Sequence, residues 1–189
     1  MKKCHFVHLG LSLIFFSCFT FIEVSGQNKL LQELAQEDQD ARSGKTVART
    51  EEERIKIVLS LIGQSELKVP EDKFNAALIL QRTGVTYCEK RLVSISPYNY
   101  LLAHYLFTSA FEGGYKEAAY LVAASIDRYL TFTQGYQKYG TNRIFNQETG
   151  KEELVPVDRK TSDSERAKYG VPSLSELLKR YPEQAPGRQ

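Results

Sequence analysis

Residue types that support metal binding and nucleophilic chemistry are scarce in this chain. Its 189 residues include no tryptophan, three cysteines and three histidines. After the first 26 residues only Cys88 and His104 remain, which excludes an internal disulfide and does not supply the ligand set of a transition-metal site. The spacing of acids that a calcium loop requires is also missing. The sequence therefore predicts no metal and no cofactor.

Motifs of common enzyme families are absent too. There is no Gly-x-Ser-x-Gly elbow and no His-Glu-x-x-His. Gly44-Lys45-Thr46 does not complete a phosphate loop, because Gln39 stands where a second glycine is needed. His104 lies in an apolar helical stretch, which favours a hydrogen-bonded core histidine over a general base. The formal charge of +2 gives no basic surface for nucleic acid, so we assign no catalytic residue and no nucleic-acid partner.

The first 26 residues read as a signal peptide. Lys2 and Lys3 form a positive start, an uncharged apolar run extends from Phe6 to Ile22, and small residues lead to a cut after Gly26. An uncleaved membrane anchor and a lipoprotein signal with attachment at Cys18 are the alternatives. The expected location is exported, either periplasmic or secreted, with no membrane span after cleavage.

Apolar residues at helical spacing dominate the remaining chain. Thr50 with Glu53 forms a capping box, Ser96-Pro97 opens a helix, and Gly113-Gly114 breaks one. The predicted helices span 28–42, 50–63, 70–82, 98–111, 115–133, 163–169 and 173–181. Residues 85–95 fit either a short helix or an irregular crossing.

The fold class follows from the order of these segments. The very short break at Gly113-Gly114 makes its two flanking helices an αα-hairpin. Two short apolar runs, 143–145 and 153–155, enclose a turn-rich segment and predict a small β-hairpin. We expect a mainly α, single-domain helical bundle over 27–182, with a central αα-hairpin, a small C-terminal β-hairpin and a loose tail over 183–189.

Two adjacent charges interrupt the apolar helix that is predicted for 115–133. Asp127 and Arg128 point about 100° apart on a helix, so they cannot simply pair with each other. A buried carboxylate here needs a cation or several hydrogen-bond donors. The arginines available to it are Arg42, Arg82, Arg143 and Arg166.

Three segments carry the same mixture of acid, amide and arginine. We hypothesise that a compact fold brings them into one polar cleft that binds a ligand. The candidate binding residues are Asp38, Gln39, Arg42, Asp127, Arg128, Gln137, Tyr139 and Thr141.

These segments also carry a resemblance. Asp127-Arg128 followed by Gln137-x-Tyr139-Gly140-Thr141 resembles a bacterial family of uncharacterised exported or cytosolic proteins, in which an Asp-Arg helix end precedes Gln-x-Tyr-Gly-Thr-Gln. Asp38-Gln39 with Arg42 is similar to an N-terminal marker of that family, and Arg166 with Gly170 and Leu174 to its C-terminal marker. This chain has Tyr136 where the family has proline and Asn142 where it has glutamine. The alanine-rich helical hairpin also resembles a Sel1-type repeat. The resemblance implies an α-rich domain and brings no established activity or ligand.

The function that we expect is an exported, non-catalytic binding or protein-interaction module of unknown ligand. Its candidate partners are a peptide, a glycan or another exported protein. One alternative is a hydrolase or lyase with Asp38 or Asp127 as the general base and an arginine that stabilises negative charge. The other is a purely structural ion-pair cluster without a ligand.

Overall fold

The structure is a computed structural model that describes residues 26–88, 91–146 and 150–183. The predicted signal peptide, together with the alternative anchor at Cys18, lies outside these residues except for Gly26. Within the described ranges, no helix has the length and apolar character needed to cross a membrane.

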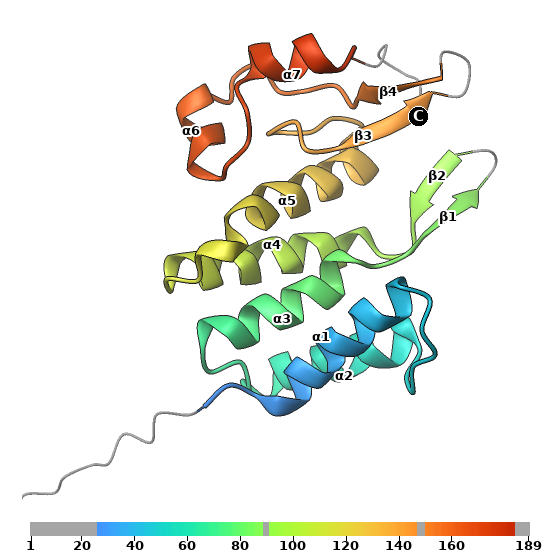
Figure 1. Cartoon of the computed structure of the whole chain (residues 1–189), viewed down its shortest axis with the longest axis vertical. Helices are drawn as coiled ribbons and strands as arrows, with labels where there is room; N and C mark the ends of the chain where they lie inside the picture. Colours follow the sequence, from blue (N-terminus) through green and yellow to red (C-terminus); the bar gives the residue numbers. More distant parts are fainter. Residues whose placement is uncertain (1–25, 89–90, 147–149, 184–189) are drawn as a thin grey trace, which may run out of the picture.

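The helices stack in the order of the sequence (Figure 1). One end of the stack is formed by α1 (Lys29–Arg42) and α2 (Glu51–Gly63), followed by α3 (Pro70–Gln81), α4 (Pro97–Glu112) and α5 (Ala119–Gln134). The closest packing joins α3 to α4 and α4 to α5. This confirms the predicted helical bundle with a central αα-hairpin.

Local capping residues set where these helices begin. Thr50 Oγ1 accepts the N–H of Glu53 at 3.2 Å and Glu53 Oε2 accepts the N–H of Thr50 at 2.8 Å, which is the predicted capping box. Asp72 is fully buried and accepts the N–H groups of Val69 and Asn28. Its carboxylate therefore joins the start of α3 to the start of α1.

Small residues bring α4 and α5 close together. The turn between them contains Gly114, whose φ of +101° favours glycine, and a short 3₁₀ helix over Lys116–Ala118. The sequence predicted that regular helix would start at Tyr115, whereas α5 begins at Ala119 after this tighter turn.

The core of the stack is formed by Leu31, Leu34, Val58, Ala76, Ala77, Ile79, Leu80, Ala103, Phe107, Ala110, Ala118 and Val122.

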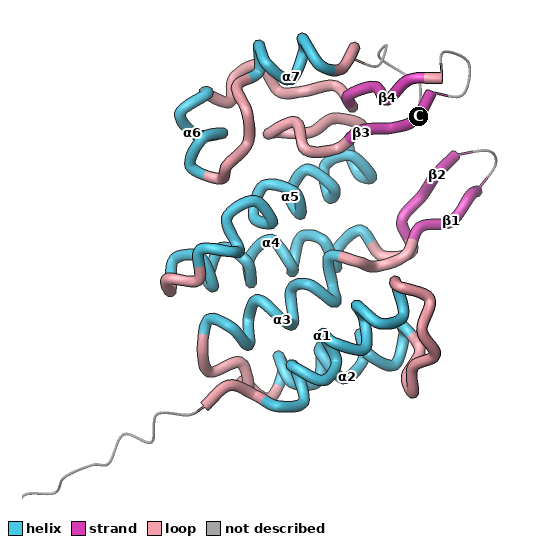
Figure 2. The backbone as a smooth tube through the Cα atoms, viewed as in Figure 1, coloured by secondary structure: helices cyan, strands magenta, loops and turns pink. Residues whose placement is uncertain are grey.

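The described residues of 85–95, which are 85–88 and 91–95, form neither a helix nor an irregular crossing. They contain β1 (Val85–Cys88) and β2 (Arg91–Ser94), an antiparallel hairpin that projects from the side of the stack (Figure 2). Both runs contain β-branched residues next to aromatic or aliphatic ones, which is a strand preference that the short length of each run concealed.

A separate layer covers α5 at the other end of the stack (Figure 1). It contains β3 (Arg143–Asn146), β4 (Lys151–Leu154), α6 (Asp163–Lys168) and α7 (Leu174–Arg180), and β3 pairs with β4 in the predicted C-terminal hairpin. Chain packing extends to Glu183, whose carboxylate accepts the N–H of Val157 at 2.8 Å. Of the predicted loose tail, 184–189 lie outside the described residues. This layer and α5 together form a second hydrophobic core, which consists of Ala123, Tyr139, Leu154, Val157, Val171 and Leu177.

Candidate functional site

Asp127 lies within α5, and its fully buried carboxylate binds the turn at residues 138–141. Oδ1 accepts the N–H groups of Lys138 and Tyr139 at 2.7 and 2.8 Å. Oδ2 accepts the N–H groups of Gly140 and Thr141, both at 2.9 Å, and the Thr141 hydroxyl at 2.8 Å. Among the described residues no arginine forms an ion pair with Asp127, so the several-donor arrangement is the one that the chain adopts.

Arg166 holds the other side of the same turn. Its guanidinium group is fully buried and donates to the carbonyl oxygens of Lys138, Tyr139, Asp158 and Thr161 at 2.5–3.3 Å. The nearest carboxylate is that of half-exposed Asp163 in α6, whose Oδ1 lies 3.9 Å from Arg166 Nη1. Carbonyl dipoles therefore provide most of the compensation for this buried positive charge.

Burial and hydrogen bonds shift the pKa values of three groups in this region. It raises the pKa of the Asp127 carboxyl, while the N–H and O–H donors of the turn act in the opposite direction. Burial also raises the pKa of the Tyr139 phenol, and the hydrogen bond from this phenol to Glu165 raises it further. The hydrogen-bonded ammonium group of Lys138, at 2.7 Å, lowers the pKa of Glu165.

Gln137 has a structural role in the same segment. Its fully buried side-chain amide donates to the carbonyl oxygens of Asn142 and Val155, and it accepts the N–H of Asn142 at 2.7 Å. Both polar atoms of this amide, Nε2 and Oε1, therefore have hydrogen-bond partners. With Asp127 and Arg166, Gln137 fixes the path of the chain from α5 into the C-terminal layer.

Asp38 organises a second polar network at the opposite end of the stack. Its Oδ2 accepts Arg42 Nε at 3.0 Å and Arg82 Nη1 at 2.7 Å, and its Oδ1 lies 3.6 Å from Arg54 Nη2. Asp38 itself is 2% exposed. One buried carboxylate therefore faces three guanidinium groups, and the local charge is positive.

The C-terminal end of α3 collects these arginines. Arg42 Nη2 donates to the carbonyl oxygen of Arg82 at 2.7 Å, and Arg128 Nη1 donates to that of Gln81 at 3.0 Å. The Arg128 guanidinium group also lies 5.4 Å from the centre of the Tyr100 ring. Open carbonyl groups and the negative end of the helix dipole explain why cations gather here.

We call Arg42, Arg82 and Arg128 the guanidinium cluster. The Arg42 and Arg82 side chains keep 41% and 21% of their surface exposed. In the described part of the chain, Nη1 of Arg42 and Nη2 of Arg82 have no hydrogen-bond partner. The cluster therefore presents free donors and positive charge to solvent.

The predicted binding residues fall into two groups. Asp38, Gln39, Arg42 and Arg128 meet at the end of α3, where Gln39 accepts a hydrogen bond from Arg82 Nη1 at 2.8 Å. Asp127, Gln137, Tyr139 and Thr141 belong to the turn beside the C-terminal layer. No hydrogen bond or ion pair among the described residues joins the two groups. The eight residues therefore belong to two separate polar networks, because Asp127 and Arg128 leave α5 in different directions.

Two buried arginines, Arg54 and Arg166, contribute to these networks in ways that the sequence did not predict. Arg54 is 3% exposed and precedes buried Val58 by one helical turn, so its position on the inner face of α2 was visible in the helical period. Its Nε has no partner among the described residues. The sequence suggested Arg166 as a partner of Asp127 and as part of the C-terminal marker of the resemblance, but no sequence signal marks carbonyl oxygens as its acceptors.

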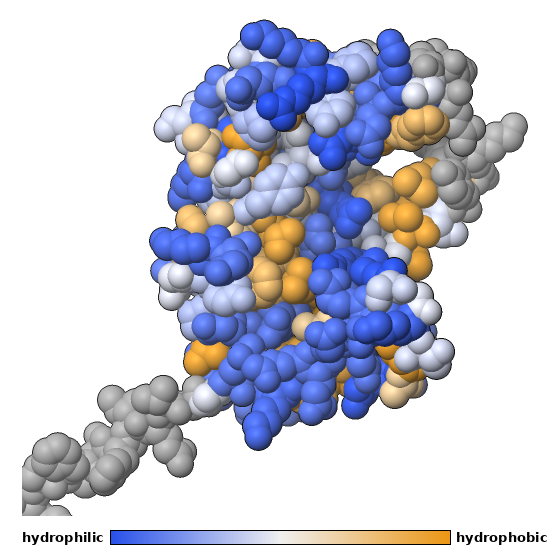
Figure 3. All heavy atoms as spheres, viewed as in Figure 1, coloured by the Kyte–Doolittle hydropathy of each residue, from blue (hydrophilic) through white to orange (hydrophobic). Residues whose placement is uncertain are grey.

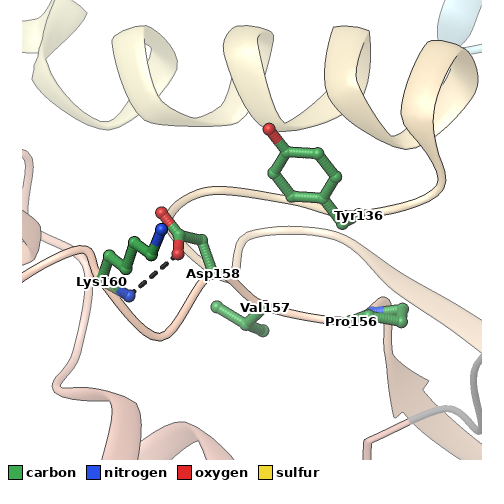
Figure 4. Close-up of a pocket in the computed structure, with 5 residues that line it drawn as sticks. All are labelled: Tyr136, Pro156, Val157, Asp158 and Lys160. Carbon is green, nitrogen blue, oxygen red and sulfur yellow. Dashed lines mark hydrogen bonds between the residues drawn. The ribbon is translucent and has the colours of Figure 1, made fainter.

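A shallow hollow of about 380 Å³ lies elsewhere, between the loop after α5 and the segment after β4. Tyr136 overhangs Asp158 and Lys160, and the one interaction drawn there joins the Lys160 N–H to Asp158 Oδ1 at 2.8 Å (Figure 4). None of the predicted binding residues lines it. The described residues also contain no group of three or more metal-ligating side chains.

Comparisons of the chain with family models, with curated protein sequences and with solved structures find no match.

Proposed function

We propose that this chain is an exported, non-catalytic binding module that recognises an acidic group of its ligand through the guanidinium cluster. The observation that carries the proposal is that three guanidinium groups face the single carboxylate of Asp38. Arg54 is the buried one of the three, and the other two belong to the guanidinium cluster. Each exposed guanidinium group keeps donors that match the two oxygens of a carboxylate. A bound acid would relieve the repulsion between neighbouring positive charges.

The environment of the two candidate general bases favours binding over catalysis. A general base must come within hydrogen-bond reach of a substrate proton. Asp38 is 2% exposed and is surrounded by arginines, and Asp127 is fully buried and accepts five hydrogen bonds. Both carboxylates are engaged with the protein itself, so the hydrolase or lyase alternative receives no support from them.

Export and family membership belong to the same proposal. Export rests on the sequence of residues 1–26, and membership rests on the resemblance around Asp127 and Asp38. The Asp127 part of that resemblance coincides with the turn that joins helices and C-terminal layer. We therefore propose that the Asp127 motif of the resemblance serves to maintain the fold, whereas the Asp38 motif serves to bind the ligand.

Calorimetric titration of the chain from Gln27 with N-acetylglutamate, inorganic phosphate and a galacturonate trimer at low salt tests the proposal. N-acetylglutamine is the neutral control. We expect saturable binding of at least one acid, no binding of the neutral compound, and weaker binding at higher salt.

The variant Arg42→Gln removes one exposed member of the cluster and leaves Arg82 and Arg54 on Asp38. We expect its affinity for the acid to fall about tenfold, or ~1.4 kcal/mol. Lys45→Gln is the matched control, since Lys45 is an exposed cation that pairs with Asp40 outside the cluster. Equal affinity of the Arg42→Gln variant and the unmodified chain, or no binding of any acid, would overturn the proposed function.

A further inference from the structure

The hairpin β1–β2 leaves a free backbone edge beside the guanidinium cluster. The N–H of Ile95 donates to the carbonyl oxygen of Gly84 at 3.1 Å, and the register pairs Val85 with Ser94 and Thr86 with Val93. In an antiparallel ladder, inward-pointing and outward-pointing backbone groups alternate. The N–H and C=O of Val85 therefore point away from β2, and no described residue engages them.

The hairpin and the chain directly after it, up to Tyr98 at the start of α4, expose apolar side chains. The exposed fractions are 43% for Val85, 42% for Leu92, 68% for Ile95 and 69% for Tyr98. Apolar side chains gather over this hairpin on the face shown in Figure 3. A two-stranded hairpin with an uncovered apolar surface has little stability of its own and gains from an added strand.

Chain connectivity places this edge next to the cluster. Val85 follows Arg82 by three residues, which limits the separation of their Cα atoms to about 11 Å. β1 runs away from Arg82, so a strand that pairs antiparallel with β1 runs back toward it. The C-terminal end of such a strand arrives at the guanidinium cluster. Besides Asp38 within the cluster, Glu51 lies at the base of the hairpin, and its carboxylate already accepts the N–H of Gly84 at 2.8 Å.

We infer that the outer edge of β1 binds the C-terminal peptide of a partner protein as an added antiparallel strand, with its terminal carboxylate on the guanidinium cluster. This inference rests on the proposed function and specifies its ligand class. Backbone hydrogen bonds supply affinity, and apolar side chains of the peptide cover Val85 on the outer strand β1. A second copy of this chain could pair with the edge but would leave the cluster without an acid, so charge complementarity favours the peptide.

The test uses pooled pentapeptides built from valine, leucine, phenylalanine and threonine, prepared as free acids and as C-terminal amides. Binding to the chain from Gln27 is measured by fluorescence anisotropy. We expect the free acids to bind about tenfold more tightly than the amides, and more tightly than N-acetylglutamate.

Two proline variants separate the edges of the hairpin. Val85→Pro removes an outward N–H from β1, and Leu92→Pro removes the corresponding outward N–H from β2. Val85 and Leu92 have nearly equal exposure, and proline is tolerated at such edge positions. We expect Val85→Pro to weaken free-acid peptide binding about tenfold, and Leu92→Pro to stay within about twofold of the unmodified chain. N-acetylglutamate binding should be retained in Val85→Pro, which verifies that this variant is folded.

Each outcome has a distinct meaning. If N-acetylglutamate binds while the free-acid pool binds no more tightly, or Val85→Pro has no effect, the peptide inference fails and the proposed function stands. If neither the small acids nor the pool binds, both fail. A dimer in sedimentation equilibrium that Val85→Pro dissociates would assign the edge to a second copy and overturn the inference.

Discussion

Asp127 and Arg166 hold opposite sides of one turn without forming an ion pair with each other. The carboxylate accepts hydrogen bonds from the N–H groups of residues 138–141, and the guanidinium group donates to the carbonyl oxygens of residues 138 and 139. Both side chains are fully buried. The peptide units of the turn therefore lie between a buried anion and a buried cation, which orients their dipoles favourably. This arrangement joins the helical stack to the C-terminal layer.

Replacing Asp127 should therefore cost stability. Asp127→Asn keeps the size of the side chain but turns an NH₂ group toward backbone N–H donors. We expect the free energy of unfolding to fall by about 3 kcal/mol, measured by urea denaturation. Glu52→Gln, at a side chain that is 79% exposed, should change it by less than about 0.5 kcal/mol. Equal stability of Asp127→Asn and the unmodified chain would remove the structural role of this carboxylate.

Asp127 and Arg166 should also be coupled energetically. Arg166→Met removes the guanidinium group and leaves the carbonyl oxygens of the turn without their donor. We expect the double variant with Asp127→Asn to lose less stability than the sum of the single variants, by about 1 kcal/mol, because either loss releases the same turn. Asp127→Asn combined with Arg54→Met, in the other network, should be additive. Additivity in both pairs would contradict coupling through the turn.

Two glycines with similar backbone angles offer a steric comparison. Gly140 and Gly114 have φ values of +98° and +101°. A Cβ at Gly140 would lie 2.6 Å from Cδ1 of buried Leu177, whereas one at Gly114 would meet nothing within 4 Å. We expect Gly114→Ala to cost about 1 kcal/mol and Gly140→Ala about 3 kcal/mol in thermal unfolding. Equal losses would show that the turn is not packed against α7 as described.

His104 should make stability depend on pH. Burial lowers the pKa of its imidazole, and the charge of Lys138 lowers it further, while hydrogen bonding to the Val122 carbonyl oxygen and the charge of Asp127 raise it. In the unfolded chain the pKa of this histidine is about 6.5. Just below that pH, the unfolded chain therefore binds a proton at His104 more readily than the folded chain does. Stability should fall as the pH drops below about 6.5, by at most ~1.4 kcal/mol per pH unit, and level off below the folded pKa.

His104→Asn retains an N–H donor near the position of Nδ1 and does not titrate. The difference between the urea stability curves of the two chains, from pH 5 to 7.5, isolates this histidine from other titrating groups. We expect the difference to narrow or change sign toward low pH. Parallel curves would mean that His104 is as easily protonated in the folded chain as in the unfolded chain.

Local signals in the sequence were sufficient for most of the elements. The capping box at Thr50 and the break at Gly113-Gly114 predicted helix boundaries, and both operate through contacts within a few residues. The hairpin over 85–94 was not predicted, because strands of four residues are too short for alternation to separate them from an irregular segment.

The candidate site was harder to predict, because its decisive partners are distant in the sequence. The acceptors of Arg166 and the donors to Asp127 are backbone groups, which carry no residue-specific signal. Asp38 and Arg42 were recognised, and one helical turn on α1 joins them, whereas Arg82 reaches Asp38 from α3. The sequence showed that charged residues needed partners but could not distribute them between two networks.

In the proposed function the Asp38 network binds an acid, whereas the Asp127 network stabilises the fold. Titration of N-acetylglutamate into Arg42→Gln and Asp127→Asn, at a temperature where both variants remain folded, tests this division directly. We expect about tenfold weaker binding for Arg42→Gln and unchanged binding for Asp127→Asn. Loss of binding in Asp127→Asn with full binding in Arg42→Gln would contradict it.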